Sequence, residues 1–169
     1  YEHGRLEICP GGAYTGDGTI NGSKENVIGI SASKLSPTIT VYTAEELNQV
    51  LATDSEYRQR EIICQFDGEA VLNRDLSIRS NDMVYIPYDG VLVIPEGITV
   101  KVDGYLYGDL RIMSGATLTV RGEGIVAILD QRISMAESGA NLNVVPGSIH
   151  VNGFEEIPGI PRNLISLTV

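Results

Sequence analysis

Three copies of one short pattern constrain the fold of this chain more than any other feature. Each copy opens with Gly and a small or aliphatic residue, and then alternates polar and apolar side chains: Gly97 to Val102, Gly115 to Val120 and Gly139 to Val144. The copies begin 18 and 24 residues apart. Alternation places every second side chain on the same face of a strand, so the copies predict three strands with matching apolar faces.

Copies at these intervals are typical of a solenoid, in which each repeat forms one turn and buries its apolar face against its neighbours. Equivalent residues of stacked turns then lie about 4.8 Å apart. We expect Val100, Leu118 and Leu142 to form one inward column, with Gly at the corner of each turn. The extra residues of the second interval are expected in a corner loop, where an insertion leaves the stack undisturbed.

The rest of the sequence divides into three parts. Residues 1–37 are rich in Gly and turn pairs and predict an irregular N-terminal arm. Residues 38–157 hold many apolar segments of about three to five residues, separated by Gly, Asn or Pro, which is typical of short strands. Residues 158–169 predict a C-terminal tail or end cap, because Pro158 and Pro161 interrupt the strand pattern.

One helix is predicted, over residues 44–53. The segment Thr43 to Glu46 has the form of a capping box, in which Thr and Glu satisfy backbone N–H groups at the start of a helix. Leu47, Val50 and Leu51 follow at the spacing of one helical stripe. We expect this apolar stripe to cover the open end of the first turn.

The charge balance and the cysteine count limit the partners. Twelve Lys and Arg against 22 Asp and Glu give a net charge of −10, which repels phosphate backbones, so nucleic acid is not expected. No apolar run approaches the roughly 18 residues that span a bilayer, so membrane insertion is not expected. Cys9 and Cys64 match no metal spacing and are interpreted as free or buried thiols, with one disulfide as the alternative.

The stretch IPEGITVKVDGYLYGDLRI, from Ile94 to Ile112, and the strand-helix segment 41–51 resemble the right-handed parallel β-helix proteins of the pectin-lyase-like superfamily. The likeness is to repeat modules of bacterial surface and secreted proteins, and it covers residues 38–153. It implies an all-β fold, a right-handed parallel β-helix with one N-terminal capping α-helix. It also implies an extracellular or cell-surface location within a larger multidomain chain.

Tyrosine side chains provide the candidate ligand-binding site. Alternation puts Tyr105 and Tyr107 on the same strand face. Tyr88 precedes them by 17 and 19 residues, close to one turn, and Tyr85 is a fourth tyrosine of this region. Flat aromatic faces suit the apolar C–H faces of sugar rings. Neighbouring carboxylates, Asp103 and Asp109, are expected at corners where they accept hydrogen bonds from sugar hydroxyls. The alternative is that the tyrosines pack at the edge of the core with their hydroxyls in water.

No catalytic set emerges from the sequence. His3 and His150 are separated by nearly the whole chain, and no Asp-Asp pair is present, although catalytic Asp pairs occur in enzymes of the resembled superfamily. No catalytic residue, metal site or cofactor is therefore expected. The predicted function is that of a non-catalytic structural or adhesive module with a polysaccharide or cell-surface glycan as partner. Two alternatives stay open: a fragment of a polysaccharide lyase or glycoside hydrolase, and a self-assembling solenoid of filament type.

Overall fold

The computed structural model describes residues 6–7, 27–28, 36–53, 57–130, 132–153 and 156–168. Most of the expected N-terminal arm, Cys9 included, therefore lies outside the described residues. Within the arm, β1 (Leu6–Glu7) pairs in parallel with β2 (Val27–Ile28).

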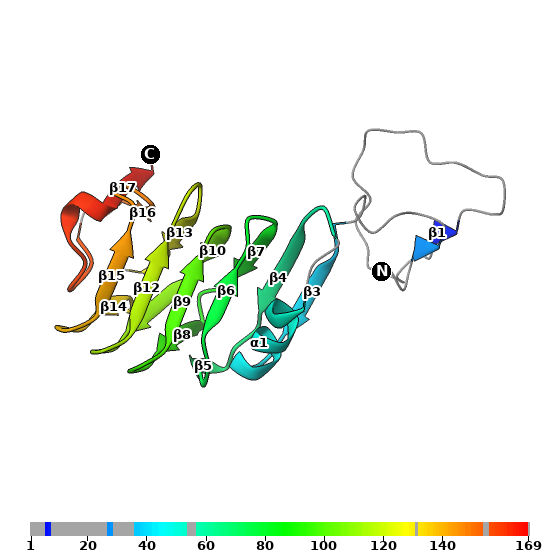
Figure 1. The fold of residues 1–169 in the computed structure, drawn as a ribbon, viewed down its shortest axis with the longest axis horizontal. Coiled ribbons are helices and arrows are strands. Elements are labelled where there is room, and N and C mark those ends of the chain that lie inside the picture. The colour runs from blue at the N-terminus through cyan, green and yellow to red at the C-terminus, as the bar shows by residue number, and fades with distance from the viewer. Residues whose placement is uncertain are drawn as a thin grey trace.

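From residue 36 onward the described chain forms a parallel β-solenoid, as the repeats predict (Figure 1). Each of the four central turns, which begin at β4, β7, β10 and β13, gives one strand to each of three sheets. The long sheet holds β3 (Thr38–Val41), β4 (Arg60–Cys64), β7 (Asp82–Tyr85), β10 (Tyr105–Tyr107), β13 (Ile125–Ile128), β16 (Ile149–Asn152) and β17 (Ile165–Thr168). The second sheet holds β5 (Gly68–Val71), β8 (Gly90–Ile94), β11 (Asp109–Ile112) and β14 (Met135–Ala136). The third holds β6 (Leu76–Ile78), β9 (Thr99–Val102), β12 (Thr117–Val120) and β15 (Asn141–Val144).

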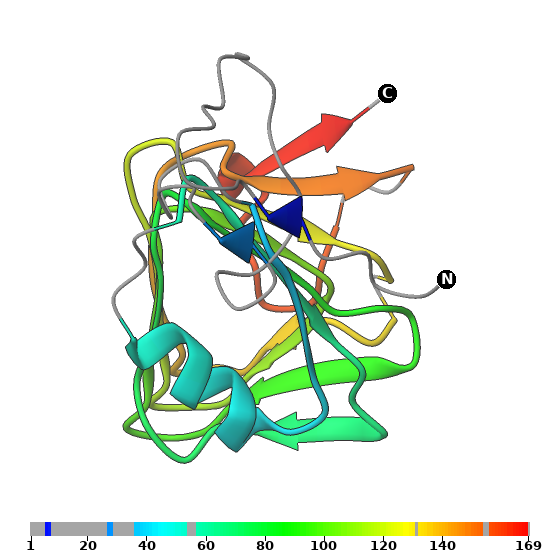
Figure 2. The same cartoon turned by 90° about the vertical axis from the view of Figure 1, so that its right-hand side faces the viewer.

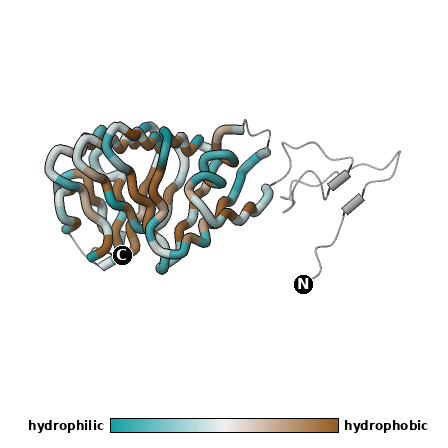
Figure 3. The backbone as a smooth tube through the Cα atoms, turned by 90° about the horizontal axis from the view of Figure 1, so that it is seen from below, coloured by the Kyte–Doolittle hydropathy of each residue, from teal (hydrophilic) through white to brown (hydrophobic). Residues whose placement is uncertain are grey.

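The register of the third sheet confirms the inward column. Leu118 pairs with Val100 on one side and with Leu142 on the other. Val100 and Leu118 are buried, whereas Leu142 is half-buried because β15 is the last strand of this sheet. Similar apolar segments lie side by side from turn to turn along the coil (Figure 3). The hydrophobic core is thus one continuous column rather than a set of separate clusters.

The glycine that opens each copy is explained by its backbone conformation. Gly97, Gly115 and Gly139 have φ values of +79°, +76° and +99°, in the left-handed region that residues with a Cβ rarely adopt. They also link the turns, since the Gly97 N–H donates to the Gly115 carbonyl at 3.2 Å and the Gly115 N–H to the Gly139 carbonyl at 3.0 Å. Each copy of the repeat therefore corresponds to a corner, formed by its glycine, and to the strand that follows.

Helix α1 (Ala44–Ala52) lies within one residue of the predicted range. The Thr43 hydroxyl accepts the Glu46 N–H at 3.1 Å, as in a capping box. The Glu46 carboxylate accepts the Tyr42 N–H at 2.7 Å, one residue before the donor that the motif normally uses. Side chains that the sequence predicted therefore accept hydrogen bonds from backbone N–H groups within the helix and just before it.

Helix α1 lies at the N-terminal end of the coil, between β3 and β4 in the chain (Figure 2). Leu47 and Leu51 are buried in the hydrophobic core, and Val50 packs against it half-buried. The helix thus occupies, in its own turn, the place that strands of the second and third sheets take in later turns. The predicted cover for the first turn is confirmed.

The C-terminal residues after β16 also form regular structure. Ile157 and Ile160 form an antiparallel bridge, and the Ala136 N–H donates to the Pro158 carbonyl at 2.9 Å. A 3-10 turn (Arg162–Leu164) then leads into β17, which pairs with β16. The segment expected as a tail or end cap therefore extends the long sheet. Among the described residues no helix is long and apolar enough to cross a bilayer, and α1 itself has nine residues.

Candidate functional site

The outward face of the long sheet is the candidate site, because it carries closely spaced aromatic and aliphatic side chains. Alternation along β7, β10 and β13 sends Val84, Leu106 and Val126 into the core, where all three are fully buried. The opposite face of the same strands carries Met83, Tyr85, Tyr105, Tyr107, Ile125 and Ala127. Of these, all but Ala127 are half-buried. We call this set the aromatic face.

Two tyrosines of adjacent turns stack on this face. Tyr85 and Tyr107 are register partners, and their ring centroids lie 5.0 Å apart with 14° between the ring planes. Nearly parallel rings this close must overlap face to face, since rings side by side in one plane would collide. Tyr105 stands next to Tyr107 on β10, with centroids 6.4 Å apart and planes within 11°. The prediction that Tyr105 and Tyr107 share a face is confirmed.

Tyr88 does not belong to this stack. Its distance in sequence from Tyr105 and Tyr107 resembled one turn, but the partner of Tyr107 is Tyr85. Tyr88 lies between β7 and β8 and is 68% exposed. It still approaches the aromatic face, because it lines a hollow together with Tyr105 and Tyr107.

The surroundings of the Tyr107 hydroxyl favour its protonated form. Partial burial, together with the neighbouring phenols of Tyr88, Tyr85 and Tyr105, raises the pKa of this hydroxyl above its ordinary value. Like any tyrosine hydroxyl, the group is protonated at neutral pH and can donate a hydrogen bond. An uncharged donor of this kind suits a hydroxyl-bearing ligand.

Two shallow hollows flank the tyrosine pair. The first, of about 240 Å³, is lined by Glu61, Met83, Val84, Tyr85, Tyr105 and Tyr107. The second, of about 330 Å³, is lined by Tyr88, Tyr105, Tyr107, Ala127, Ile128, Leu129, His150, Val151 and Asn152. The second falls at the lower end of the range of roughly 300–1,000 Å³ that is usual for ligand sites. It combines aromatic walls with amide, imidazole and phenol groups.

Asp103 lies at a corner, as expected, but its carboxylate is already engaged. Arg121 binds it through two hydrogen bonds, Nε to Oδ1 at 2.9 Å and Nη2 to Oδ2 at 2.7 Å. The Arg121 guanidinium lowers the pKa of Asp103, so this carboxylate stays ionised. Asp103 and Tyr105 line a third hollow, so the structure brings these two predicted site residues together.

Asp109 is not the exposed corner residue that the sequence predicted. It is the first residue of β11 and is 1% exposed. Its Oδ1 accepts the Asp130 N–H at 2.8 Å and the Ser134 hydroxyl at 2.8 Å. Both donors belong to the longer loop between β13 and β14, which covers Asp109 from the next turn. Its role is to hold that loop, and it is not accessible to a ligand on the aromatic face.

The described residues contain no group of three or more His, Cys, Asp or Glu side chains that could hold a metal ion. Cys64 is a free and buried thiol, and burial raises its pKa to about 12. A thiol that stays protonated is a poor nucleophile and a poor metal ligand. Cys64 therefore serves as a core residue.

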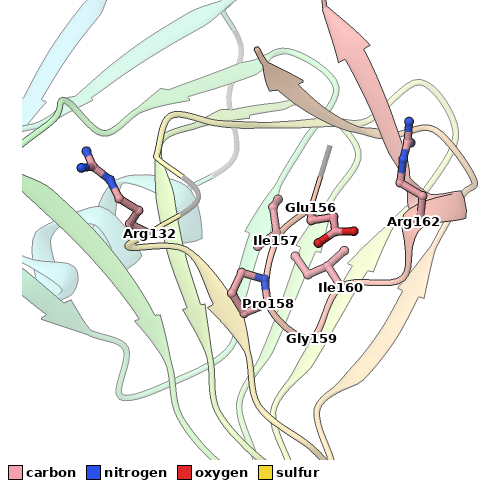
Figure 4. A pocket seen from close by; sticks show the side chains of 7 residues that line it. All are labelled: Arg132, Glu156, Ile157, Pro158, Gly159, Ile160 and Arg162. Atoms are coloured by element: carbon pink, nitrogen blue, oxygen red, sulfur yellow. The ribbon is translucent and has the colours of Figure 1, made fainter. Parts of the chain in front are cut away.

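The hollow near the C-terminal end is larger but less suited to a ligand. It has a volume of about 640 Å³ and is lined by Arg132, Glu156, Ile157, Pro158, Gly159, Ile160 and Arg162. The two arginines lie on opposite sides of the segment that carries Ile157 and Ile160, and their side chains point away from it (Figure 4). Arg132 is also bound to Asp130, with 2.8 Å between Nη2 and Oδ2. The positive groups therefore do not converge on one anion.

Sequence reasoning missed Ala127, which belongs to the aromatic face, and His150, which lies on the next strand of the same sheet. Both belong to the column that contains Tyr107, since Ala127 pairs with Tyr107 and His150 pairs with Ala127. Alternation within each strand shows which residues face outward. It does not show which residues of successive turns pair, because that also depends on the length of each turn.

No protein-family model, curated protein or solved structure matches this chain, so its assignment as a parallel β-solenoid rests on its own sheet register and burial.

Proposed function

We propose that this chain is a non-catalytic carbohydrate-binding β-solenoid module, with a structural or adhesive role, and that the aromatic face is its ligand platform. The observation that carries the proposal is the stack of Tyr85 and Tyr107 beside Tyr105 on an outward sheet face. Each of these tyrosines is half-buried and lines a hollow, so part of each ring remains open to a ligand. Aromatic rings with one apolar face and a polar tip suit a ligand with C–H faces and hydroxyls.

The proposal is non-catalytic because neither of the two acids predicted for the site, Asp103 and Asp109, is free to act on a ligand. Hydrolysis of a glycosidic bond requires two carboxyl groups on either side of it, one of which must supply a proton. Asp103 is held ionised by Arg121, and Asp109 is covered by the loop between β13 and β14. An ionised acid bound to arginine is badly placed to deliver a proton. A lyase or hydrolase fragment is therefore the less favoured alternative.

We further propose that the module belongs to a larger bacterial surface or secreted protein, in keeping with the resemblance of its repeats to pectin-lyase-like β-helices. The acidic balance of the chain agrees with a carbohydrate partner rather than a phosphate-bearing one. End-to-end assembly into a filament is less favoured, because α1 packs against β6 and covers part of the N-terminal end of the coil, where strand edges would otherwise be available.

The test is binding of neutral oligosaccharides to the purified chain on a glycan array, followed by calorimetry. The double variant Tyr105→Ala/Tyr107→Ala is expected to weaken any bound glycan at least tenfold, because both stacking surfaces are removed. Tyr42→Ala is the matched control, since Tyr42 is an exposed tyrosine outside the aromatic face, and it should leave affinity unchanged. Equal affinity of the double variant and the wild type would exclude this platform. Turnover of an acidic polysaccharide would contradict the non-catalytic assignment.

A further inference from the structure

The column of outward residues that contains the tyrosine stack has a gap. From turn to turn the column reads Tyr85, Tyr107, Ala127 and His150. One face of the Tyr107 ring is covered by Tyr85. The other face is directed toward the next strand, where the register partner is Ala127. A methyl group therefore stands where a further ring would continue the stack.

The spacing of the sheet fixes the width of this gap. Neighbouring strands lie about 4.8 Å apart, so the positions of Tyr107 and His150, two strands apart, are separated by about 9.6 Å. Carbon atoms in contact lie about 3.5–4.0 Å apart, so a ring sandwiched between two others needs about 7–8 Å. One ring fits between the two side chains, and two do not.

The hollow of about 330 Å³ lies at this place. Its lining includes Tyr107 and His150 as well as Ala127, which is 7% exposed. Asn152 and Tyr88 also line it and carry an amide and a phenol, so the rim contains both donors and acceptors. The hollow is therefore lined by aromatic rings and a methyl group together with side chains that can donate and accept hydrogen bonds.

We propose that this gap is a subsite for one uncharged pyranose ring, held between the side chains of Tyr107 and His150 above the methyl group of Ala127. This inference rests on the proposed carbohydrate-binding function and names its central contact. The C–H groups of the sugar face the two rings, and its hydroxyls reach the rim groups Asn152 and Tyr88. An acidic sugar fits poorly, because the chain carries a net charge of −10.

The decisive variant fills the gap. Ala127→Tyr places a ring on Tyr107 and completes the column, so it is expected to abolish sugar binding while the melting temperature stays equal or rises. Thr119→Tyr is the matched control, because it adds the same side chain to a half-buried outward position of β12, in another sheet. It should bind sugar as the wild type does. His150→Ala removes one wall without filling the gap and should weaken binding at least tenfold, which keeps the test valid if Ala127→Tyr folds poorly.

The probes are the hexasaccharides of cellulose, xylan, mannan and chitin, with oligogalacturonate as the acidic comparison and indole as a planar aromatic one. Binding of a neutral hexasaccharide that is lost in Ala127→Tyr and kept in Thr119→Tyr supports the subsite. Binding that persists in both Ala127→Tyr and His150→Ala overturns the subsite but leaves the proposed function standing. Absence of binding to every saccharide overturns both. Preference for oligogalacturonate overturns the uncharged ligand class, and binding of indole alone points instead to an aromatic side chain of a partner protein.

Discussion

At the scale of single residues, the side chains of Arg60 and Asp82 form a buried ion pair that the sequence did not reveal. Arg60 is 2% exposed and Asp82 is fully buried. Their contact is bidentate, with Nε to Oδ1 at 2.7 Å and Nη2 to Oδ2 at 3.1 Å. The remaining nitrogen, Nη1, donates to the Val50 carbonyl at 2.8 Å, in the last turn of α1. The pair therefore joins the helix to β4 and β7, and a cation satisfies a carbonyl at the helix end.

Replacing Asp82 by Asn is expected to destabilise the fold by about 3–5 kcal/mol, because it leaves the Arg60 charge buried without a counter-charge. The measurement is the free energy of unfolding in urea. Asp67→Asn, at an exposed turn position, is the control and should change it by less than about 0.5 kcal/mol. The double variant Arg60→Met/Asp82→Leu should be more stable than Asp82→Asn. A double variant as unstable as the single one would show that shape, and not charge, governs this site.

At the scale of elements, the start of α1 depends on one hydroxyl. Thr43→Ala should lower the free energy of unfolding by about 0.5–2 kcal/mol, because the Glu46 N–H then loses its acceptor. Thr43→Ser keeps the acceptor and is the matched control, expected to stay near the wild type. Urea denaturation of the three proteins decides the question, and equal stability of all three would mean that the cap does not contribute.

The elements also show which parts of the structure were accessible to sequence reasoning. The inward column and α1 were predictable because both depend on local periodicity and on a cap motif. The pairing of Tyr85 with Tyr107 was not, because successive turns differ in length. The residues paired between turns are 22 positions apart for Tyr85 and Tyr107 but 18 apart for Val100 and Leu118, so no single period aligns them all.

Burial of charged groups was not predictable for a related reason. Asp109 is buried by donors 21 and 25 residues later in the chain. Arg60 meets Asp82 across one complete turn. Both contacts are made between turns, whereas the local pattern around an acid at the start of a strand is that of an exposed residue. Sequence reasoning therefore placed Tyr105 and Tyr107 on one face, but it also assigned to the site the carboxylate of Asp109, which is buried and cannot contact a ligand there.

At the scale of the whole molecule, the core is well covered in the middle turns and thinner at the C-terminal end. Leu118 lies between Val100 and Leu142 and is 1% exposed. Leu142 is half-buried, since in the described part of the chain no strand pairs with the far side of β15. The same side chain in the same column therefore has different surroundings in successive turns.

Leu118→Ala is expected to cost about 2–5 kcal/mol, because it empties a packed core position. Leu142→Ala should cost clearly less, since a half-buried side chain loses less apolar area. Thr119→Ala, on the outward face, should change stability by less than about 0.5 kcal/mol. Unfolding in urea measures all three. Equal costs for Leu118→Ala and Leu142→Ala would contradict the thinning of the core toward the C-terminal end.

The stacking of successive turns, strand on strand within each sheet, also has a mechanical consequence. The hydrogen bonds between turns run along the length of the coil. A pull at its two ends would therefore break the bonds of one terminal turn before those of the next. A turn such as the one from Leu106 to Val126 would release 20 residues, which extend to roughly 70 Å. Under tension the chain would lengthen in discrete steps and rewind onto the turns that remain. A sudden load on such a coil would be taken up by its lengthening.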